Sequence, residues 1–211
     1  MSRKTAKCRR PAPVTRRAAK TELQPWNPIM YLNPLGSVSG FSFGVLRTSY
    51  AGKANSASAF VKAKLHPVSL PAAAAAWAPT AHRWEVLLPP DGGDDLLDPR
   101  RLIELFEATA LPWRQGLLTT VKLNFGEADR LHAAYEKGRA WLRSLVRSRG
   151  LPAIIIQHCP HEAGLEYRRH HLHILIVPRS LGIAGFGACD DELTSDAGQR
   201  VLYSSWSSFE E

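Results

Sequence analysis

HHLHILIVPR, residues 170–179, is the most informative segment of this chain for its fold. Its apolar and β-branched composition predicts a strand, in which successive side chains point to opposite faces of a sheet. In that strand His171 and His173 share one face, while the leucine and isoleucine side chains next to them share the other. The two imidazoles lie about 7 Å apart along the strand, close enough to converge on one metal ion.

A third imidazole is expected from a neighbouring strand. The segment AIIIQH, residues 153–158, predicts a strand that pairs with the first one across a polar loop. His158 ends this strand, so the sequence predicts a three-imidazole site made by His158, His171 and His173. A divalent ion held there would polarise a phosphoryl oxygen and orient an attacking group.

The plainer interpretation is that a His-x-His pair on a strand is incidental. Here the third histidine and the flanking arginines favour a site for a metal ion or a phosphate group. Two other histidines are close by in the sequence. His170 faces away from His171 and is expected to be exposed or to cap the core, and His161 in the loop is an alternative ligand.

The rest of the chain predicts a mixed α+β fold. Alternating apolar residues predict strands, and a spacing of three to four residues predicts helices. The predicted elements are strands near 41–47, 84–88 and 116–125, and helices from Pro99, over 127–149 and over 195–209. Short helices crossing between strands, followed by a hairpin, predict an antiparallel sheet with helices mainly on one face.

The length of 211 residues predicts one domain, and changes in composition along the chain mark appendages to it. Residues 1–22 are expected to form a basic, disordered arm, because like charges and prolines prevent a packed core. Residues 23–80, rich in Pro, Gly and Ala, are expected to be an irregular N-terminal extension. Residues 81–211 are expected to hold the α+β domain.

Positive charge is concentrated in the arm. Residues 1–20 contain eight Lys or Arg and no acid, and the whole chain has a net charge of +8, so residues 21–211 sum to zero. Such an arm is either a solvated terminus or a segment that neutralises nucleic-acid phosphates. A stripe of arginines on the 127–149 helix is either a solvated face or a second basic surface. The candidate nucleic-acid-binding residues are Arg9, Arg10, Arg16, Arg17, Arg139, Arg143 and Arg147.

Several protein classes are not expected. No run of eighteen apolar residues and no apolar stretch after Met1 is present, which predicts neither membrane insertion nor export. The three cysteines show no paired spacing, which fits a reducing cytoplasm. The sequence also lacks the glycine-rich motifs that cradle nucleotide phosphates, so a nucleoside-triphosphate motor is not expected.

His171-Leu172-His173, with a histidine thirteen residues earlier, resembles the motif of the histidine-hydrophobe-histidine (HUH) endonucleases. These are the rolling-circle replication initiators and conjugative relaxases of plasmids. The Thr-rich strand LLTTVKLNF, residues 117–125, is similar to the first motif of the initiators. Residues 185–209 resemble plasmid-borne members only in the general character of their sequence. The resemblance covers about residues 113–209 and implies a ferredoxin-like palm of antiparallel sheet and helices.

The resemblance implies nicking and strand transfer on single-stranded DNA at a plasmid or mobile-element origin. Mg²⁺ or Mn²⁺ on His158, His171 and His173 would polarise the scissile phosphate, and a tyrosine hydroxyl would attack it and become joined to the 5′ end. Other replication or mobilisation proteins would be partners.

The nucleophile is where the sequence departs from the family. Tyr203 lies on the right sort of helix for an initiator, but Ser207 stands where initiators commonly have lysine. Relaxases place the tyrosine near the N-terminus, where Tyr31 is the near match, but Val177 stands where they tend to have asparagine. Tyr203 as an ordinary packing residue is an equal alternative.

Two other functions use the same residues. HLHILIVPR is similar to the motif of the histidine-triad nucleotide hydrolases, with His173 as nucleophile, although Leu175 replaces their third histidine. The other alternative is a nucleic-acid-binding protein that has the fold and has lost cleavage. The arm and the arginine stripe would suffice for it, with aromatic residues such as Trp113 stacking on bases.

Overall fold

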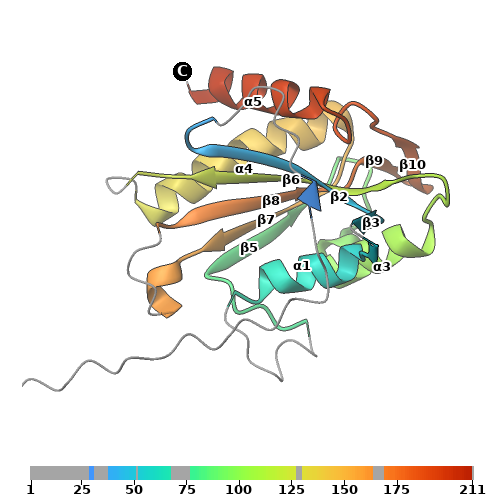
Figure 1. Cartoon of the computed structure of the whole chain (residues 1–211), viewed down its shortest axis with the longest axis horizontal. Helices are drawn as coiled ribbons and strands as arrows, with labels where there is room; N and C mark the ends of the chain where they lie inside the picture. Colours follow the sequence, from blue (N-terminus) through green and yellow to red (C-terminus); the bar gives the residue numbers. More distant parts are fainter. Residues whose placement is uncertain are drawn as a thin grey trace, which may run out of the picture.

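The structure is a computed structural model that describes residues 29–30, 38–50, 52–67, 77–126, 130–163 and 169–210 (Figure 1). The strands are β1 Ile29–Met30, β2 Phe41–Arg47, β3 Ser49–Tyr50, β4 Lys53–Ala54, β5 Arg83–Leu87, β6 Gly116–Asn124, β7 Ala153–His158, β8 His171–Ile176, β9 Arg179–Gly182 and β10 Gly185–Cys189. The helices are α1 Ala57–Leu65, α3 Pro99–Ala108, α4 Leu131–Arg149 and α5 Ala197–Glu210, with short 3₁₀ turns η1 Asp94–Leu97 and η2 Pro160–Ala163.

The main sheet has six strands in the order β1-β2-β6-β8-β7-β5. Every neighbouring pair is antiparallel, so β8 is an inner strand with β6 on one side and β7 on the other. Two small hairpins, β3–β4 and β9–β10, stand outside this sheet. The predicted α+β class, the antiparallel sheet and the pairing of the two histidine-bearing strands are confirmed.

The two faces of the sheet pack against different helices. The long helices α4 and α5 cover one face, where Phe43, Leu172 and Ile174 are buried. Helices α1 and α3 pack on the other face, where Ile156 and Leu175 are buried. Figure 1 shows α4 and α5 on one side of the sheet and α1 and α3 on the other. Most helical residues therefore lie on one face, as predicted, and α1 and α3 add a second layer.

Helix α4 packs directly on β8 because a glycine faces the strand. A Cβ added at Gly138 would overlap Leu172 Cδ1, whereas the bare glycine lets the helix approach. The buried stripe of the helix includes Tyr135 and Trp141. The helix ends at Gly150, which adopts the left-handed conformation that glycine tolerates without strain (φ +65°).

The main sheet includes two strands, β1 and β2, that precede the predicted domain boundary at residue 81. Within the stretch expected to be irregular, 23–80, β2 is an inner strand that pairs with β6 along its whole length. Helix α1 follows it, starting after Ser56, whose hydroxyl accepts a 3.1 Å hydrogen bond from the Ala59 amide. The strand predicted near 41–47 is thus confirmed, and the irregular extension is wrong for residues 41–65. Proline and glycine near both elements suggested irregularity, but burial of apolar side chains from both elements decides otherwise.

The basic arm, residues 1–22, lies outside the described residues, and its disorder stays a prediction. Within the described ranges, no helix combines the length and the apolarity needed to cross a membrane.

Candidate metal centre

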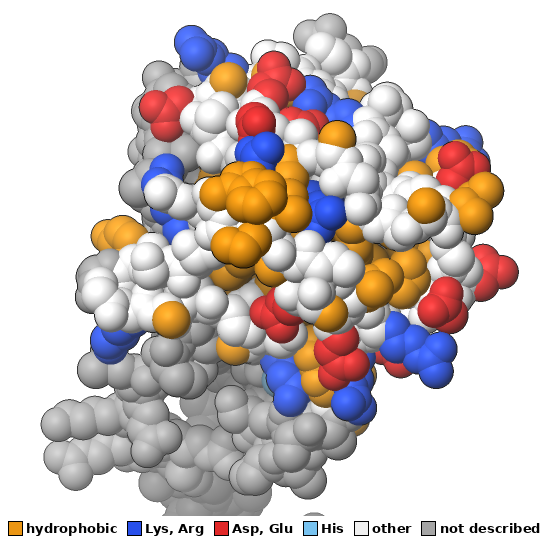
Figure 2. Space-filling model, turned by 90° about the vertical axis from the view of Figure 1, so that its right-hand side faces the viewer, with side chains coloured by type: hydrophobic (Ala, Val, Ile, Leu, Met, Phe, Trp, Pro, Cys, Tyr) orange, Lys and Arg blue, Asp and Glu red, His pale blue; other side chains and the backbone are white. Residues whose placement is uncertain are grey.

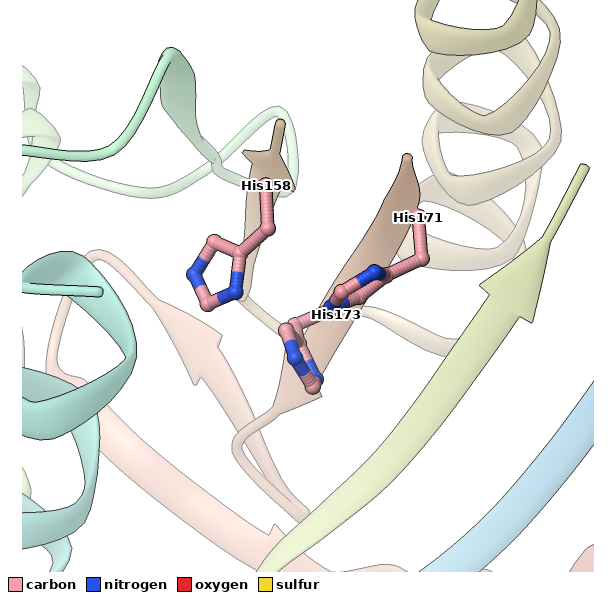
Figure 3. Close-up of side chains that lie close together, drawn as sticks. All are labelled: His158, His171 and His173. Carbon is pink, nitrogen blue, oxygen red and sulfur yellow. The ribbon is translucent and has the colours of Figure 1, made fainter. Parts of the chain in front are cut away.

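Three imidazoles converge on the face of the sheet that carries α1 and α3. In the register of β7 and β8, His158 is opposite His171, and His173 is opposite Ile156. The ring centroids are 5.2 Å apart for His158 and His171, 4.6 Å for His158 and His173, and 4.9 Å for His171 and His173. Figure 3 shows the rings turned toward one another from the two strands. The predicted convergence of these histidines is present.

The three rings are uncharged at neutral pH. Their exposed fractions are 9% for His158 and His171 and 8% for His173. Burial lowers the pKa of His171 to about 4 and also lowers the pKa of His158. Burial, followed by the charge of Lys64, holds the pKa of His173 well below its usual value. Neutral imidazole is the form that ligates a metal ion, so the site needs no proton release to bind one.

Backbone carbonyls orient two of the rings. His158 Nε2 lies 2.6 Å from the Lys64 carbonyl, and His171 Nδ1 lies 3.1 Å from the Arg169 carbonyl. A carbonyl oxygen only accepts, so these ring nitrogens carry the protons and donate. The lone pairs are then on Nδ1 of His158 and Nε2 of His171. Such outer hydrogen bonds fix the tautomer of metal-ligating histidines.

The donor set fits a metal ion. Each of the three histidines offers a ring nitrogen, and these atoms lie within 4.8 Å of one another. Three neutral nitrogen donors, two of them with outer hydrogen bonds, make a binding site for a divalent ion with coordination positions left open. The cluster could therefore hold a metal ion.

Two lysines stand beside the histidines, and the sequence interpretation missed both. Lys122 on β6 is the register partner of His173, so the two side chains share a face. Lys64 is on α1 and, through its carbonyl, contacts His158. A hollow of about 30 Å³ lies between β2, β6, β8 and α1; its lining is Ser42, Phe43, Gly44, Lys64, Thr120, Lys122 and His173. Alternation along the 116–125 strand could have placed Lys122, but Lys64 fell in the stretch expected to be irregular.

A second group of possible ligands lies next to β7. The ligand atoms of His82, Cys159 and Glu162 lie within 4.8 Å of one another. His82 Nδ1 is 2.9 Å from Glu162 Oε1, which gives this pair a structural explanation as an ion pair. Burial raises the pKa of the Cys159 thiol to about 11, so the sulfur keeps its proton at neutral pH.

The two remaining histidines of the motif region do not join the cluster. His170 stacks on Phe125, with ring centroids 5.8 Å apart and planes inclined by 5°. It is half-buried, as expected for a residue that caps the core. His161, considered as an alternative ligand, is exposed in η2.

The structure does not bring Tyr203 to the histidines. Tyr203 is on α5 and packs against the core of the opposite face, where its ring meets Phe41 edge-on at 5.4 Å. The sheet itself separates this hydroxyl from His171 and His173. Tyr203 is therefore a packing residue in this arrangement and is not positioned to attack a phosphate bound at the histidines. Tyr31 lies outside the described residues; it directly follows Met30 of β1.

The predicted arginine stripe is on α4, again on the face opposite the histidines. Arg139 forms an ion pair with Glu85 on β5, with Nη2 2.7 Å from Oε1, and this pairing lowers the pKa of Glu85. Arg143 Nη2 is 4.0 Å from the same oxygen, and Arg147 is exposed. The stripe is thus partly engaged in holding α4 to the edge strand. Arg9, Arg10, Arg16 and Arg17 lie outside the described residues.

An apolar cleft is present at the far end of the sheet, near the start of β6. It encloses about 340 Å³ and its lining includes Phe106, Leu111 and Trp113. Trp113 has an exposed fraction of 72%. Figure 2 shows hydrophobic side chains gathered near the middle of this side of the molecule, with charged side chains around them. Six residues of strand, roughly 20 Å, separate the start of β6 from Lys122.

Comparison with known proteins gives a fold and no family. No protein-family model matches the chain, and no curated protein matches it. A solved structure from work on the molecular basis of vancomycin resistance transfer in Staphylococcus aureus is similar, with a TM-score of 0.52 and 14% sequence identity. The similarity covers 63% of this chain and 69% of that chain. The chain thus has the fold of that transfer-related structure, together with a buried three-histidine cluster that could bind a metal ion.

Proposed function

We propose that this protein is an HUH-type enzyme that nicks and transfers single-stranded DNA at a plasmid or mobile-element origin. The observation that carries the proposal is the convergence of His158, His171 and His173 on two inner strands of an antiparallel sheet. The similarity to a structure connected with resistance transfer, and the basic N-terminal arm, support the same function.

His158, His171 and His173 would hold the ion that this chemistry uses. Three nitrogen donors suit a transition-metal ion such as Mn²⁺ better than Mg²⁺, which prefers oxygen ligands. When bound, the ion polarises the phosphoryl oxygen of the scissile linkage. The chain contributes the neutral imidazoles, the carbonyls that orient two of them, and their buried surroundings.

The covalent step is a transesterification. A tyrosine hydroxyl attacks phosphorus, a new phosphorus–oxygen bond to the tyrosine forms, and the bond to the 3′ oxygen breaks. The tyrosine proton ends on the departing 3′ hydroxyl, so no oxidant or water is consumed. The nucleophile we propose is Tyr31, since Tyr203 lies across the sheet and Tyr31 matches the N-terminal position found in relaxases.

The test is covalent attachment of DNA to the full chain. The purified protein is incubated with Mn²⁺ and a labelled single-stranded oligonucleotide library, and denaturing electrophoresis then detects protein-linked label. We expect attachment by the wild type and by Tyr203→Phe, and none by Tyr31→Phe, because each substitution removes one hydroxyl. Attachment by Tyr31→Phe but not by Tyr203→Phe would overturn the assignment of the nucleophile.

Two outcomes would replace the proposal. Cleavage of adenosine dinucleotides that is lost in His173→Ala would establish a histidine-triad hydrolase. Binding of single-stranded DNA without attachment under any metal condition would establish a non-catalytic binding protein.

A further inference from the structure

Polar side chains on the histidine face continue beyond the three histidines. On β6, Thr120 and Lys122 point to this face, and Ser42 on β2 is the register partner of Lys122. Thr120 has an exposed fraction of 5%. This part of the face is therefore polar, unlike the apolar residues that pack against α1 and α3 elsewhere on it.

These groups meet at the small hollow beside His173. Lys64 enters it from α1 and Lys122 from β6, and both line it together with Ser42 and Thr120. A volume of about 30 Å³ holds roughly one or two water-sized groups. The hollow therefore has room for oxygen atoms of a phosphate and none for a nucleobase.

The charges of the two lysines reach the histidines. Lys122 is the register partner of His173, the Lys64 carbonyl contacts His158, and both lysines line the hollow together with His173. Two ammonium groups at this place repel positive charge at the imidazoles. A divalent cation bound there meets the same repulsion, and a nearby anion relieves it.

We propose that Lys64 and Lys122 form a phosphodiester-binding pair, so that the metal ion and a backbone phosphate of single-stranded DNA bind cooperatively at this site. This inference rests on the proposed function and adds its positioning residues. The two ammonium groups would hold the phosphate beside the histidines, and the hollow lined by Ser42 and Thr120 would take one of its oxygens. Either ligand alone binds weakly, because the metal alone meets the lysines and the phosphate alone lacks the metal.

The experiment measures Mn²⁺ affinity of the full chain by calorimetry, with and without a mixed-sequence single-stranded oligonucleotide. For the wild type, the oligonucleotide is expected to tighten Mn²⁺ binding on the order of tenfold. A methylphosphonate oligonucleotide of the same sequence, which has an uncharged backbone, is expected to give no tightening.

The variants Lys122→Met and Lys64→Met are expected to change Mn²⁺ affinity in opposite directions without and with DNA. Without DNA, each is expected to bind Mn²⁺ several-fold more tightly than the wild type, because one repelling charge is gone. With DNA, each is expected to lose most of the tightening. Lys122→Arg retains the charge and is expected to behave as the wild type. Lys53→Met removes a charge from the exposed strand β4 and is the matched control.

The outcomes separate the two proposals. If the wild type binds Mn²⁺ and DNA without coupling, or if the lysine variants couple them as the wild type does, the lysine assignment is overturned. If the wild type binds neither ligand, the proposed function fails as well. If thymidine 5′-monophosphate tightens Mn²⁺ binding as much as the oligonucleotide, the pair recognises a nucleotide phosphomonoester and the phosphodiester assignment is overturned.

Discussion

The two faces of strand β8 differ in chemistry although they alternate along the same six residues. One face presents Leu172 and Ile174, which are completely buried against α4 and α5. The other presents His171 and His173, which are nearly as buried but face two lysines and a hollow. All four side chains are buried, so burial alone does not distinguish the two faces.

The two faces of β8 contribute differently to the stability of the fold. Burying the leucine and isoleucine stabilises the fold, since apolar surface is removed from water. Burying imidazoles costs free energy, because these groups lose hydration and their charged form. Substitutions on either face, metal binding and pH test this contrast.

Truncation on the apolar face is expected to cause the greatest loss. Ile174→Ala should lower the free energy of unfolding by about 2–5 kcal/mol, because it removes buried methyl groups and leaves a cavity. Urea denaturation with EDTA present measures it. The matched variant on the other face, His173→Leu, should change the free energy by less than about 1 kcal/mol or increase it. Equal losses in the two variants would mean that both faces serve stability alike.

Metal binding is expected to stabilise the fold through the histidine face alone. At about 100 times its dissociation constant, Mn²⁺ should raise the free energy of unfolding by about 2.7 kcal/mol. The double variant His171→Leu/His173→Leu should lose this gain, and Ile174→Val should keep it. Thermal melting with and without Mn²⁺ measures this stabilisation in each variant. A rise that persists in the double variant would place the ion elsewhere.

Acid is expected to destabilise the folded state through the histidines. In the unfolded chain His171 takes up a proton near pH 6.5, whereas in the folded chain it does so near pH 4, with His158, His173, Lys64 and Lys122 facing it. Above pH 6.5 both states are neutral and His171 makes no difference. Between pH 6.5 and 4 only the unfolded state binds the proton, so stability falls with falling pH and levels off below 4.

Unfolding in EDTA at pH 7 and pH 5 measures this effect. His171 alone should account for about 2 kcal/mol of the loss between the two values. His171→Leu should show a loss smaller by that amount. If the variant and the wild type lose stability equally, His171 is not held neutral by its surroundings.

Deletion of residues 1–20 is expected to have the smallest effect on stability. The deletion changes the formal charge from +8 to 0 and leaves both faces of β8 intact, so the melting temperature should stay constant. If about half of the eight charges contact phosphates, the salt dependence of single-stranded DNA binding should flatten by about 3. Binding measured against salt for both forms decides this. Equal slopes would make the arm a solvated terminus.

Most of the histidine site could be predicted from the residues alone. Side-chain alternation in a strand is local and has a period of two, so His171 and His173 had to share a face. A polar loop between two apolar strands made their pairing the simplest topology, which brought His158 to the same place. The α+β class followed from the same local periodicities.

Which other residues reach that site depends on how the elements pack together. Tyr203 was a reasonable nucleophile in sequence, but α5 packs on the opposite face. Lys64 came from a stretch that appeared irregular and is placed against His158 by α1. The face on which a helix packs depends on the path of the chain and on burial contacts between residues far apart in sequence. Periodicity within one segment carries no information about that choice, because it fixes only which side of the segment is apolar.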